Sequence, residues 1–382
     1  MNFDLSQEQD MIRNTVREFA EREIQPIAGQ LDEEEQFSYD LVRKMGELGL
    51  LGMNIPSEYG GYDFDTLSYI LAVEELARVD SSQAVTLAAH NSLGVAPLFY
   101  FGNEEQRLKY IPQLCTGNAL WAFGLTEAEA GSDSRGSKTI AYLDGDEWVI
   151  NGSKTFITNA ATDITAGMLV QVVTGEDAKG KKQFTTLIVE AGTPGMKAAP
   201  MHNKMMWRAS NTAEVFFDDC RIPKENVLGE IGQGSKIMLS TLDNGRLSIA
   251  AMGLGLAQGA YEKALKYAKE REQFGRPISK FQAISFKLAD MAMKLELARN
   301  TLYKACWLKD ENKPFAQLSA MSKLYCSEIA KEIADEAVQI HGGYGLMKDY
   351  DVERFYRDQR ILQIGEGTSE IQRLVIARSI GC

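Results

Sequence analysis

The sequence predicts a mainly α-helical protein with one small β domain inserted between two helical parts. Apolar residues recur at helical spacing over residues 1–118 and again over residues 228–382. Between these parts, over residues 119–227, the chain consists of short runs rich in Ile, Val, Thr, Phe and Trp, separated by Gly, Asp and Asn. We therefore expect three domains with these bounds, and a cleft where they meet, because ligands favour such junctions.

The N-terminal helical domain should begin with an amphipathic helix. Ser6 and Gln9 form a capping-box pattern, and apolar residues then recur every three or four positions until Pro26. A second capping box starts at Asn103, before a short helix that should end near Pro112. Further helical patterns between them cover residues 39–48, 65–79 and 81–101.

The middle domain should contain short strands connected by tight turns. The strands are expected at residues 139–143, 148–150, 154–157, 167–173, 184–189 and 213–217. Asp144, Gly145 and Asp146 separate the first two strands and are typical of a hairpin turn. The domain is therefore predicted to be a small antiparallel β unit.

The C-terminal helical domain should be a bundle of long helices. The polar stretch Leu242–Leu247 is expected to interrupt the first of them. Within this stretch Asp243 and Arg246 could pair with each other on the surface, or face the cleft and hold a polar ligand. The helical patterns cover residues 235–270, 280–309, 314–340 and 368–380.

Charge and composition exclude several classes of function. The net charge of −12 and the pI near 5.0 argue against a nucleic-acid or anionic-membrane partner, because both attract basic surfaces. The five cysteines lack a C-x-x-C pair and the three histidines share no ligand spacing, so neither disulfides nor a metal site is expected. No apolar run approaches the ~18 residues of a membrane span and no targeting peptide is evident, so we expect a cytoplasmic protein.

The stretch Ile364–Arg373 contains the candidate catalytic base. Glu366 lies between Gly365 and Gly367, where no side chain crowds its carboxylate and the backbone can approach a ligand closely. A segment that begins like a helix follows at once. A solvated glutamate in a Gly-rich turn would give the same pattern, so the assignment depends on the other motifs.

Two motifs around the start of the middle domain could contact a planar cofactor. Thr126 and the backbone at Phe123 and Leu125 could bind the edge of a flavin ring. Phe156 could cover one face of the ring while Thr158 forms a hydrogen bond with it. A capped loop, a core phenylalanine and a strand threonine explain the same residues without any ligand.

Two further motifs lie at the ends of long helices. Arg271 could meet a pyrophosphate and Gln282 an adenosine group, although an arginine that binds the last carbonyls of a helix is the simpler explanation. Glycines at 342, 343 and 345 follow another helix and indicate close backbone approach. Because no G-x-G-x-x-G follows a strand there, a Rossmann site is not indicated.

Taken together, these motifs resemble the acyl-CoA dehydrogenase family. In chain order they are I-P-S-E-Y-G-G, F-G-L-T-E-x-x-x-G-S-D, N-G-S-K-x-F-I-T-N, R-x-Q-F-G-R-P-I, Q-I-H-G-G-Y-G and G-E-G-T-S-E-I-Q-R. The resemblance runs the length of the chain. It implies an N-terminal helical domain, a middle antiparallel β barrel and a C-terminal four-helix bundle, with one FAD per subunit in a homotetramer built as a dimer of dimers.

The resemblance also implies roles for individual residues. Glu366 matches the catalytic base, and the residues that match the acyl-CoA side are Ser132, Asp243, Arg246 and Gly367. The positions that match FAD contacts are Phe123, Leu125, Thr126, Phe156, Ile157, Thr158, Arg271, Phe274, Gln282, Gln339, Gly342, Gly343, Thr368 and Glu370. Several of those within residues 271–343 are implied to act across the dimer interface.

The implied reaction is the α,β-dehydrogenation of an acyl-CoA thioester to a 2-enoyl-CoA. Glu366 would remove the α-proton, and the β-hydride would pass to flavin N5. Because that proton is weakly acidic, the site must stabilise the enolate and exclude water. The resemblance implies that a flavin ribityl hydroxyl and the N–H of Glu366 bind the thioester oxygen, and that an electron-transferring flavoprotein accepts the electrons.

Three positions bear on how closely the family pattern is followed. Some family members carry the base at the position of Gly245, which offers no carboxyl group here, so Glu366 has no competitor. Met206 stands where the pattern usually has glycine, which puts the contacts of that loop in doubt. Asn91 lies on a helix that borders the acyl pocket in the family, although helix packing explains it equally well.

The sequence leaves the acyl group and the electron acceptor open. Short straight-chain, branched and cyclic acyl groups all fit, and the pattern around Glu366 and Gly245 favours short or compact ones. The alternative within the same fold is an oxygen-using relative, either an acyl-CoA oxidase or a flavin monooxygenase, and the monooxygenase generally lacks the base. A flavin-free binding scaffold is the alternative from another class, and it would purify without colour.

Overall fold

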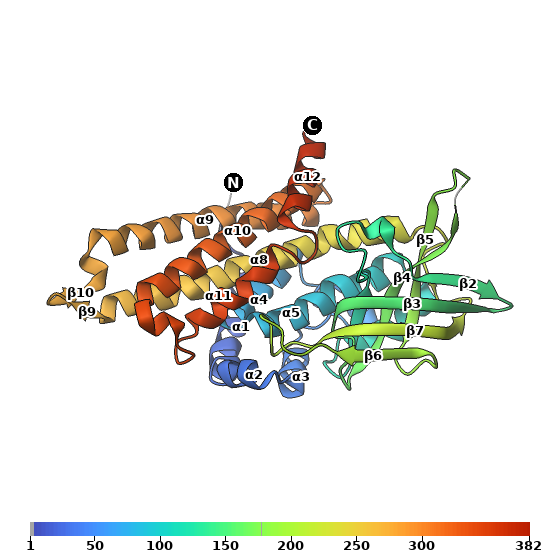
Figure 1. Cartoon of the computed structure of the whole chain (residues 1–382), viewed down its shortest axis with the longest axis horizontal. Coiled ribbons are helices and arrows are strands. Elements are labelled where there is room, and N and C mark those ends of the chain that lie inside the picture. Colours follow the sequence, from blue (N-terminus) through green and yellow to red (C-terminus); the bar gives the residue numbers. More distant parts are fainter. Residues whose placement is uncertain (1–3, 177) are drawn as a thin grey trace.

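The computed structural model describes residues 4–176 and 178–382, and it confirms a mainly helical chain with an inserted β domain. The β domain lies at one end of the molecule and the long C-terminal helices reach to the other (Figure 1). The N-terminal helices pack along these long helices between the two ends (Figure 1).

The N-terminal part is helical with two irregular turns. Capping boxes are present at Ser6 and Asn103, as predicted. The predicted helix over residues 81–101 is divided by a π-helical segment, Ala89–Val95, and a second such segment, Ala20–Ile24, follows α1. The helices are α1 (Gln7–Phe19), α2 (Ala28–Glu34), which the sequence did not suggest, α3 (Tyr39–Glu47), α4 (Thr66–Val79), α5 (Ser81–Ala88), α6 (Ala96–Phe101) and α7 (Glu104–Leu114), with a 3₁₀ turn at Ser57–Tyr59.

One mostly antiparallel sheet makes up the β domain. The strands are β1 (Leu120–Gly124), β2 (Ile140–Asp144), β3 (Glu147–Thr158), β4 (Thr165–Glu176), β5 (Lys182–Glu190), β6 (Met196–Pro200), β7 (Thr212–Pro223) and β8 (Val227–Leu228), with a 3₁₀ turn at Ser134–Gly136. Their order is β6-β7-β3-β2-β4-β5-β8, and β1 pairs with β4. The β1–β4 pairing and a single β2–β4 pair are parallel, which the antiparallel expectation did not include.

Two expected strands in this domain are one continuous strand. The patterns at residues 148–150 and 154–157 both belong to β3, which runs past Gly152 with a shift of register against β7. Gly152 has a φ of 142°, and a Cβ there would lie 2.7 Å from the Cα of Thr139, so only glycine allows this close approach. The predicted hairpin at Asp144–Asp146 does connect β2 to β3.

Long helices form the C-terminal part. They are α8 (Gly234–Glu270), α9 (Gln282–Asp310), α10 (Ala316–His341), α11 (Val352–Leu362) and α12 (Ser369–Ser379); a small hairpin of β9 (Glu272–Gln273) and β10 (Arg276–Pro277) joins α8 to α9, with 3₁₀ turns at Ile278–Lys280 and Gly342–Leu346. The expected interruption at Leu242–Leu247 is wrong, because α8 is helical throughout that stretch.

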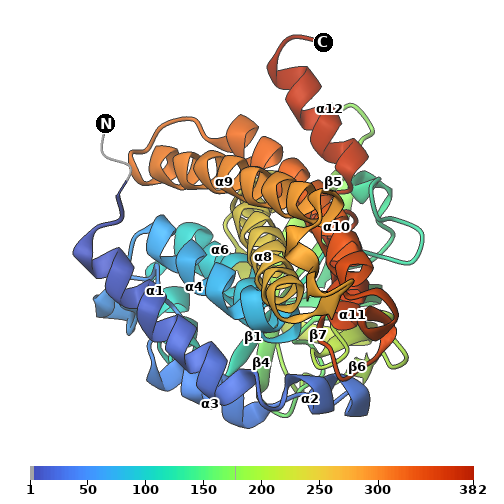
Figure 2. The same cartoon turned by 90° about the vertical axis from the view of Figure 1, so that its left-hand side faces the viewer.

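The centre of the helical core is α8. Figure 2, which looks along the molecule, shows α8 surrounded by α4, α9 and α10. A Cβ on Gly255 would lie 2.1 Å from the carbonyl oxygen of Glu74, and a Cβ on Gly259 would lie 2.0 Å from that of Arg78. These two glycines therefore let α4 pack directly on the backbone of α8.

A buried charge cluster joins α2, α5, α11 and the loop before β7. It consists of Asp32, Asp80, Arg354 and Asp358, each at most 5% exposed. Asp358 accepts a hydrogen bond of 2.8 Å from the backbone N–H of Trp207. Burial, followed by the negative charge of Asp80, raises the pKa of Asp358 to about 7.

Within residues 4–176 and 178–382, no helix combines the length and the apolar character needed to cross a membrane.

Candidate active site

Glu366 lies in a strained turn between α11 and α12. Its φ is 52° and that of Gly367 is 93°, a conformation that costs free energy for a glutamate and is held by its surroundings. Gln372 Nε2 donates hydrogen bonds to the carbonyl oxygens of Gly367 (2.9 Å) and Glu366 (3.3 Å). The hydroxyl of Thr368 caps α12 by accepting from the N–H of Ile371. The turn therefore presents Glu366 in one defined direction.

The carboxylate of Glu366 packs against the backbone of α8 at Gly245. A Cβ built on Gly245 would lie 1.9 Å from Oε2 of Glu366 and 3.0 Å from Cδ2 of Leu93. Any side chain at position 245 would therefore displace the carboxylate. Within the described part of the chain, Oε2 is buried and has no hydrogen-bond partner. This oxygen is free to accept a proton from a ligand.

Charged groups from two helices surround this carboxylate. Arg246 of α8 is 4% exposed and forms an ion pair with Asp243, and Lys323 of α10 is fully buried. The Lys323 ammonium donates a hydrogen bond of 2.7 Å to the carbonyl oxygen of Gly367. We refer to Asp243, Arg246, Lys323 and Glu366 as the Glu366 cluster.

Burial is the main influence on the pKa values in the Glu366 cluster. It raises the pKa of Glu366 to about 7, against the opposing effects of Lys323 and Arg246. It lowers the pKa of Lys323 to about 8, although the charge of Glu366 acts in the other direction. Burial also raises the pKa of Asp243, against the effect of Arg246. A base that titrates near neutral pH is suited to proton abstraction.

A small cavity of about 30 Å³ lies between α4, the π-helical segment after α5, α8 and α9. Tyr69, Ser92 and Leu247 line it, and so does Asn244, whose buried Oδ1 has no partner among the described residues. Asn91 also lines it while binding the backbone at Leu50 and Gly52. Asn91 is thus explained both by packing and by its position at this cavity.

The candidate flavin-ring residues of the β domain do come together. The N–H of Thr155 donates to the carbonyl of Thr126 at 2.9 Å, which places the two motifs side by side. Phe156 has a φ of 60° and is 64% exposed, an unusual state for a large apolar residue. An exposed ring next to threonine hydroxyls fits the face and edge of a flavin. This set, the ring set, consists of Phe123, Leu125, Thr126, Phe156, Ile157 and Thr158.

The candidate pyrophosphate and adenine residues form a second group at the tip of the long helices. Arg271 lies 5.8 Å from the ring of Tyr344 and has no ion pair with any described residue. Phe274 has a φ of 53° and is 93% exposed. This tip set consists of Arg271, Phe274, Gln282, Gln339, Gly342 and Gly343.

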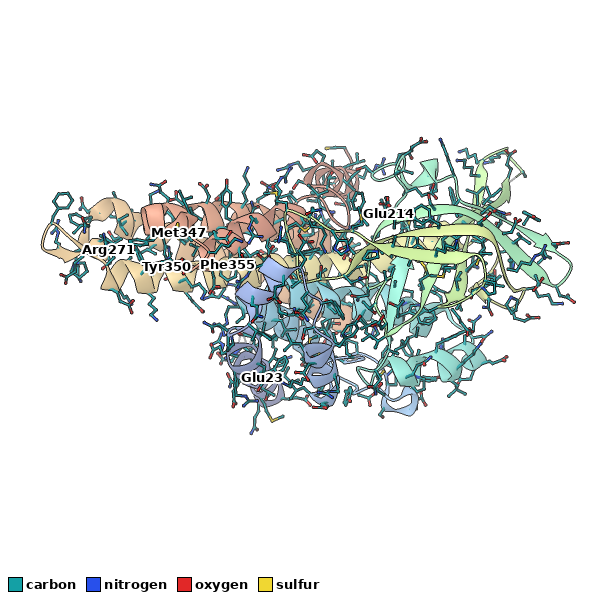
Figure 3. The ribbon with its side chains drawn as sticks, turned by 60° about the horizontal axis from the view of Figure 1, so that its bottom comes forward. Glu23, Glu214, Arg271, Met347, Tyr350 and Phe355 are labelled. Carbon is teal, nitrogen blue, oxygen red and sulfur yellow. The ribbon has the colours of Figure 1, made fainter. Side chains whose placement is uncertain are left out.

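The chain does not bring the ring set and the tip set together. Figure 3 shows Arg271 at the tip of the long helices, whereas Glu214, near the start of β7, lies well away from that tip, where the β domain begins. Thr368 and Glu370 lie at the start of α12, near the Glu366 turn. Ser132 is exposed in the loop after β1, and no hydrogen bond among the described residues ties it to Asp243 or Arg246.

Sequence reasoning missed Lys323 and the buried ion pair of Lys154 with Glu127. The signal for Lys323 was its position on an otherwise small and apolar stripe of α10, with Ala320, Cys326 and Ala330. Lys154 Nζ donates to Glu127 at 2.7 Å and to the carbonyl of Leu125 at 3.2 Å. Lys154 lies within the N-G-S-K-x-F-I-T-N motif, but no sequence pattern indicated that Glu127 is its partner.

The loop that contains Met206 packs against the helical core. Met206 is half-buried against the helical core, and the next residue, Trp207, has a φ of 48°.

Among the described residues, no group of three or more His, Cys, Asp or Glu side chains could hold a metal ion.

Three domain families match the chain. Residues 6–118 match the N-terminal domain of acyl-CoA dehydrogenases, residues 122–220 the middle domain and residues 232–381 the C-terminal domain. The chain belongs to the acyl-CoA dehydrogenase family. The resemblance seen in the sequence is therefore confirmed.

Individual family members resemble the chain over its whole length. A probable acyl-CoA dehydrogenase, YngJ of Bacillus subtilis, is 52% identical over 380 residues, with 100% of both chains covered. The butyryl-CoA dehydrogenase of Megasphaera elsdenii has a TM-score of 0.96 at 42% identity, covering 100% of both chains. A chain solved in work on the electron transferring flavoprotein of Acidaminococcus fermentans gives a TM-score of 0.96 at 45% identity, again covering 100% of both.

Proposed function

We propose that this acyl-CoA dehydrogenase converts a short acyl-CoA thioester to the trans-2-enoyl-CoA, with Glu366 as the base that removes the α-proton. The observation that carries the proposal is the buried, unpartnered Oε2 of Glu366, packed on Gly245. Family structures with FAD or FADH2 bound support FAD as the cofactor. When bound, FAD supplies the acceptor for the β-hydride.

The Glu366 turn offers two groups to one substrate. Its carboxylate can take the α-proton, and its N–H donates to no oxygen of the described residues, so it is available to the thioester oxygen. A hydrogen bond there would stabilise the negative charge that develops on that oxygen as the proton leaves. Burial of the carboxylate excludes water and brings its pKa near 7, where it is both ionised and basic enough.

Holding FAD requires residues from two subunits. In the ring set, Phe156 would cover the ring face while Thr126 and Thr158 bind its edge, and Thr368 and Glu370 lie at the neighbouring helix start. In the tip set, Arg271 and Phe274 are exposed, and Arg271 forms no ion pair with any described residue. Since the two sets lie apart in one subunit, we infer a symmetric assembly in which the tip set of one subunit completes the ring set of another, in a homotetramer.

The acyl group is proposed to be short. The likeness to the butyryl-CoA dehydrogenase of M. elsdenii supports this. We propose that four residues contact the acyl-CoA substrate: Ser132, Asp243, Arg246 and Gly367.

An electron-transferring flavoprotein is the proposed electron acceptor. The similarity to the chain solved in work on the electron transferring flavoprotein of A. fermentans supports this.

The test is an anaerobic titration of the purified yellow protein with straight, branched and cyclic acyl-CoA thioesters, following the flavin absorbance near ~450 nm. We expect butyryl-CoA to bleach the flavin, and Glu366→Gln to retain FAD and bind the thioester while bleaching several orders of magnitude more slowly. Fast bleaching by Glu366→Gln would refute the base assignment. Rapid re-oxidation of the bleached protein by air, without an added acceptor, would favour an acyl-CoA oxidase instead.

A further inference from the structure

Lys323 is the one member of the Glu366 cluster for which the proposed reaction has no role. It is fully buried on α10, on the side that packs against α8. A lysine ammonium is rarely buried this completely, because removal from water costs several kcal/mol unless charges and hydrogen bonds compensate. The groups that offset this cost for Lys323 indicate its role.

The hydrogen bond of Lys323 is made to the turn that carries the base. Its ammonium donates at 2.7 Å to the carbonyl of Gly367, the residue directly after Glu366. The same carbonyl accepts a second hydrogen bond, from Gln372, at 2.9 Å. Two donors on one carbonyl fix a peptide whose neighbouring φ angles are 52° and 93°. The strained turn is thus held from α10 and from α12.

The charges around Glu366 leave Lys323 as its counter-ion. From α8, Arg246 is already engaged in an ion pair with Asp243. From α4, Tyr69 contributes a neutral hydroxyl, which is bound to Ser248. On the outer side, Glu328 of α10 and Glu370 of α12 act on Lys323 more weakly than Glu366 does. Lys323 is therefore the positive charge of the cluster that forms no ion pair with a described residue, and Glu366 is the charged group that acts on it most strongly.

We propose that Lys323 is a positioning residue of the dehydrogenation: it fixes the Glu366 turn through the Gly367 carbonyl and supplies a positive charge that favours the ionised form of Glu366. This inference rests on the proposed function of Glu366 as the base. It adds to that function a residue on another helix, some forty positions away in the chain, on which the protonation state of the base depends.

The sign of the effect follows from the charges. Lys323 favours the ionised form of Glu366 and so lowers a pKa that burial has raised to about 7. Without the lysine charge, the pKa of Glu366 should rise further. A larger share of the enzyme would then hold a protonated, inactive base at pH 7, and activity would return only at higher pH.

The decisive experiment measures the protonation of Glu366 directly. The carbonyl-stretch band of a protonated carboxylic acid is followed by difference infrared spectroscopy of the holoenzyme between pH 5 and 10, and Glu366→Gln identifies the band by its loss. For the wild type we expect a midpoint near 7. For Lys323→Met and for Lys323→Gln, which retains a donor without charge, we expect a midpoint at least about one unit higher.

Two further variants control for structural damage. Lys323→Arg keeps the positive charge and should keep the wild-type midpoint, whereas Lys331→Met removes an exposed lysine from the same helix and should change nothing. In single-turnover bleaching by butyryl-CoA, Lys323→Gln should be at least about fivefold slower than wild type at pH 7 and recover by pH 9.

An unchanged midpoint in both neutral variants would overturn the proposal, and so would a loss of rate that is equal at all pH values. Failure of the proposed function looks different, because Glu366→Gln would then bleach normally whatever Lys323 does.

Discussion

At the scale of single residues, the site depends on a contact between a side chain and a backbone. The carboxylate of Glu366 occupies the place where a side chain of α8 would otherwise lie, above Gly245. The carboxylate is buried there, and burial raises its pKa to about 7. The absence of a side chain at Gly245 therefore lets the carboxylate of Glu366 occupy this buried place.

The first prediction concerns pH. A base must be deprotonated to act, and burial raises the pKa of Glu366 to about 7. The rate of flavin bleaching by bound butyryl-CoA should therefore rise with pH, reach half its maximum near pH 7, and level off above it. Stopped-flow bleaching at saturating substrate between pH 5.5 and 9 measures this, and a rate that is flat across that range would contradict the assignment.

Replacement of Gly245 by alanine should displace the base without unfolding α8. A Cβ at 1.9 Å from Oε2 must push the carboxylate away by an ångström or more. Misplacement of this size costs about 100-fold in rate. The variant should still bind FAD, which its absorbance spectrum reports, while single-turnover bleaching slows.

The matched control for this variant is Gly29→Ala on α2, where the nearest atom to a built Cβ is Arg354 Nη1 at 3.8 Å. Wild-type rates in Gly29→Ala are expected. Wild-type rates in Gly245→Ala as well would mean that the carboxylate does not act from this position.

Residues of the site were predictable from the sequence only where a local pattern marked them. The two glycines around Glu366 marked it as the candidate base, an assignment that depended on the other motifs, and two further motifs marked Phe156 and Arg271. Lys323 could not be found this way, because its hydrogen bond to Gly367 depends on how α10 packs against a turn some forty residues later in the chain. A buried lysine on an apolar stripe is a signal, but it does not name the partner.

At the scale of secondary-structure elements, the ion pair of Lys154 with Glu127 connects β3 to the loop after β1. Their side chains are 0% and 9% exposed. Removal of one partner from a buried pair leaves the other charge uncompensated, at a cost of about 3–5 kcal/mol. Lys154→Met should therefore lower the free energy of unfolding of the β domain by about 3 kcal/mol and weaken FAD retention, because the ring set is carried by these two segments.

Urea denaturation followed by tryptophan fluorescence measures this, since Trp121 and Trp148 lie in the β domain. Lys138→Met is the comparison, because its partner Glu129 and Lys138 itself are about 70% exposed. An exposed pair contributes less than about 1 kcal/mol. Equal losses in the two variants would show that burial of the Lys154 pair has no special effect.

Elements were predicted well where periodicity and caps were clear, as at Ser6, Asn103 and along α9 and α10. The expected break in α8 failed for a physical reason. Asp243 and Arg246 disturb the apolar pattern because they face the site, not because the helix ends there. The strand β1 was missed because it is buried on both faces and so shows no alternation.

At the scale of the whole molecule, the charge cluster around Asp358 couples the packing of α2, α5 and α11 to pH. Its carboxyl has a pKa raised from near 4 in an unfolded chain to about 7, by burial and by Asp80. A carboxyl whose pKa is higher in the folded state than in the unfolded state adds to the free energy of unfolding. This contribution is complete below about pH 4 and is lost as the pH rises through about 7. Wild-type protein should therefore lose stability between pH 5 and pH 8.

Asp358→Asn should remove much of that loss, because an amide oxygen can still accept from the N–H of Trp207. We expect the variant to be more stable than wild type at pH 8 by about 1–3 kcal/mol, with a smaller gain at pH 5. Thermal unfolding at the two pH values measures this, with the exposed Asp349→Asn as control. A variant less stable than wild type at pH 8 would show that Arg354 needs the charge.

The arrangement of the three parts was accessible from the sequence only through its resemblance to a family. Periodicity gave helices, then strands, then helices, but it did not show that Arg271 lies at the tip of the long helices, away from the β domain that carries Phe156 (Figure 3). Such distances depend on how α8 and α9 extend past the body of the molecule, which no local pattern records.

The separation of the ring set from the tip set has a genetic consequence. If each cofactor site combines the ring set of one subunit with the tip set of another, two different inactive alleles can restore activity when expressed together. A Phe156→Ala chain and an Arg271→Met chain would each be defective alone. In a mixed pair, one of the two sites would be assembled entirely from intact halves, so about a quarter of all sites in an even mixture should be functional. Two alleles that alter the same set should never complement.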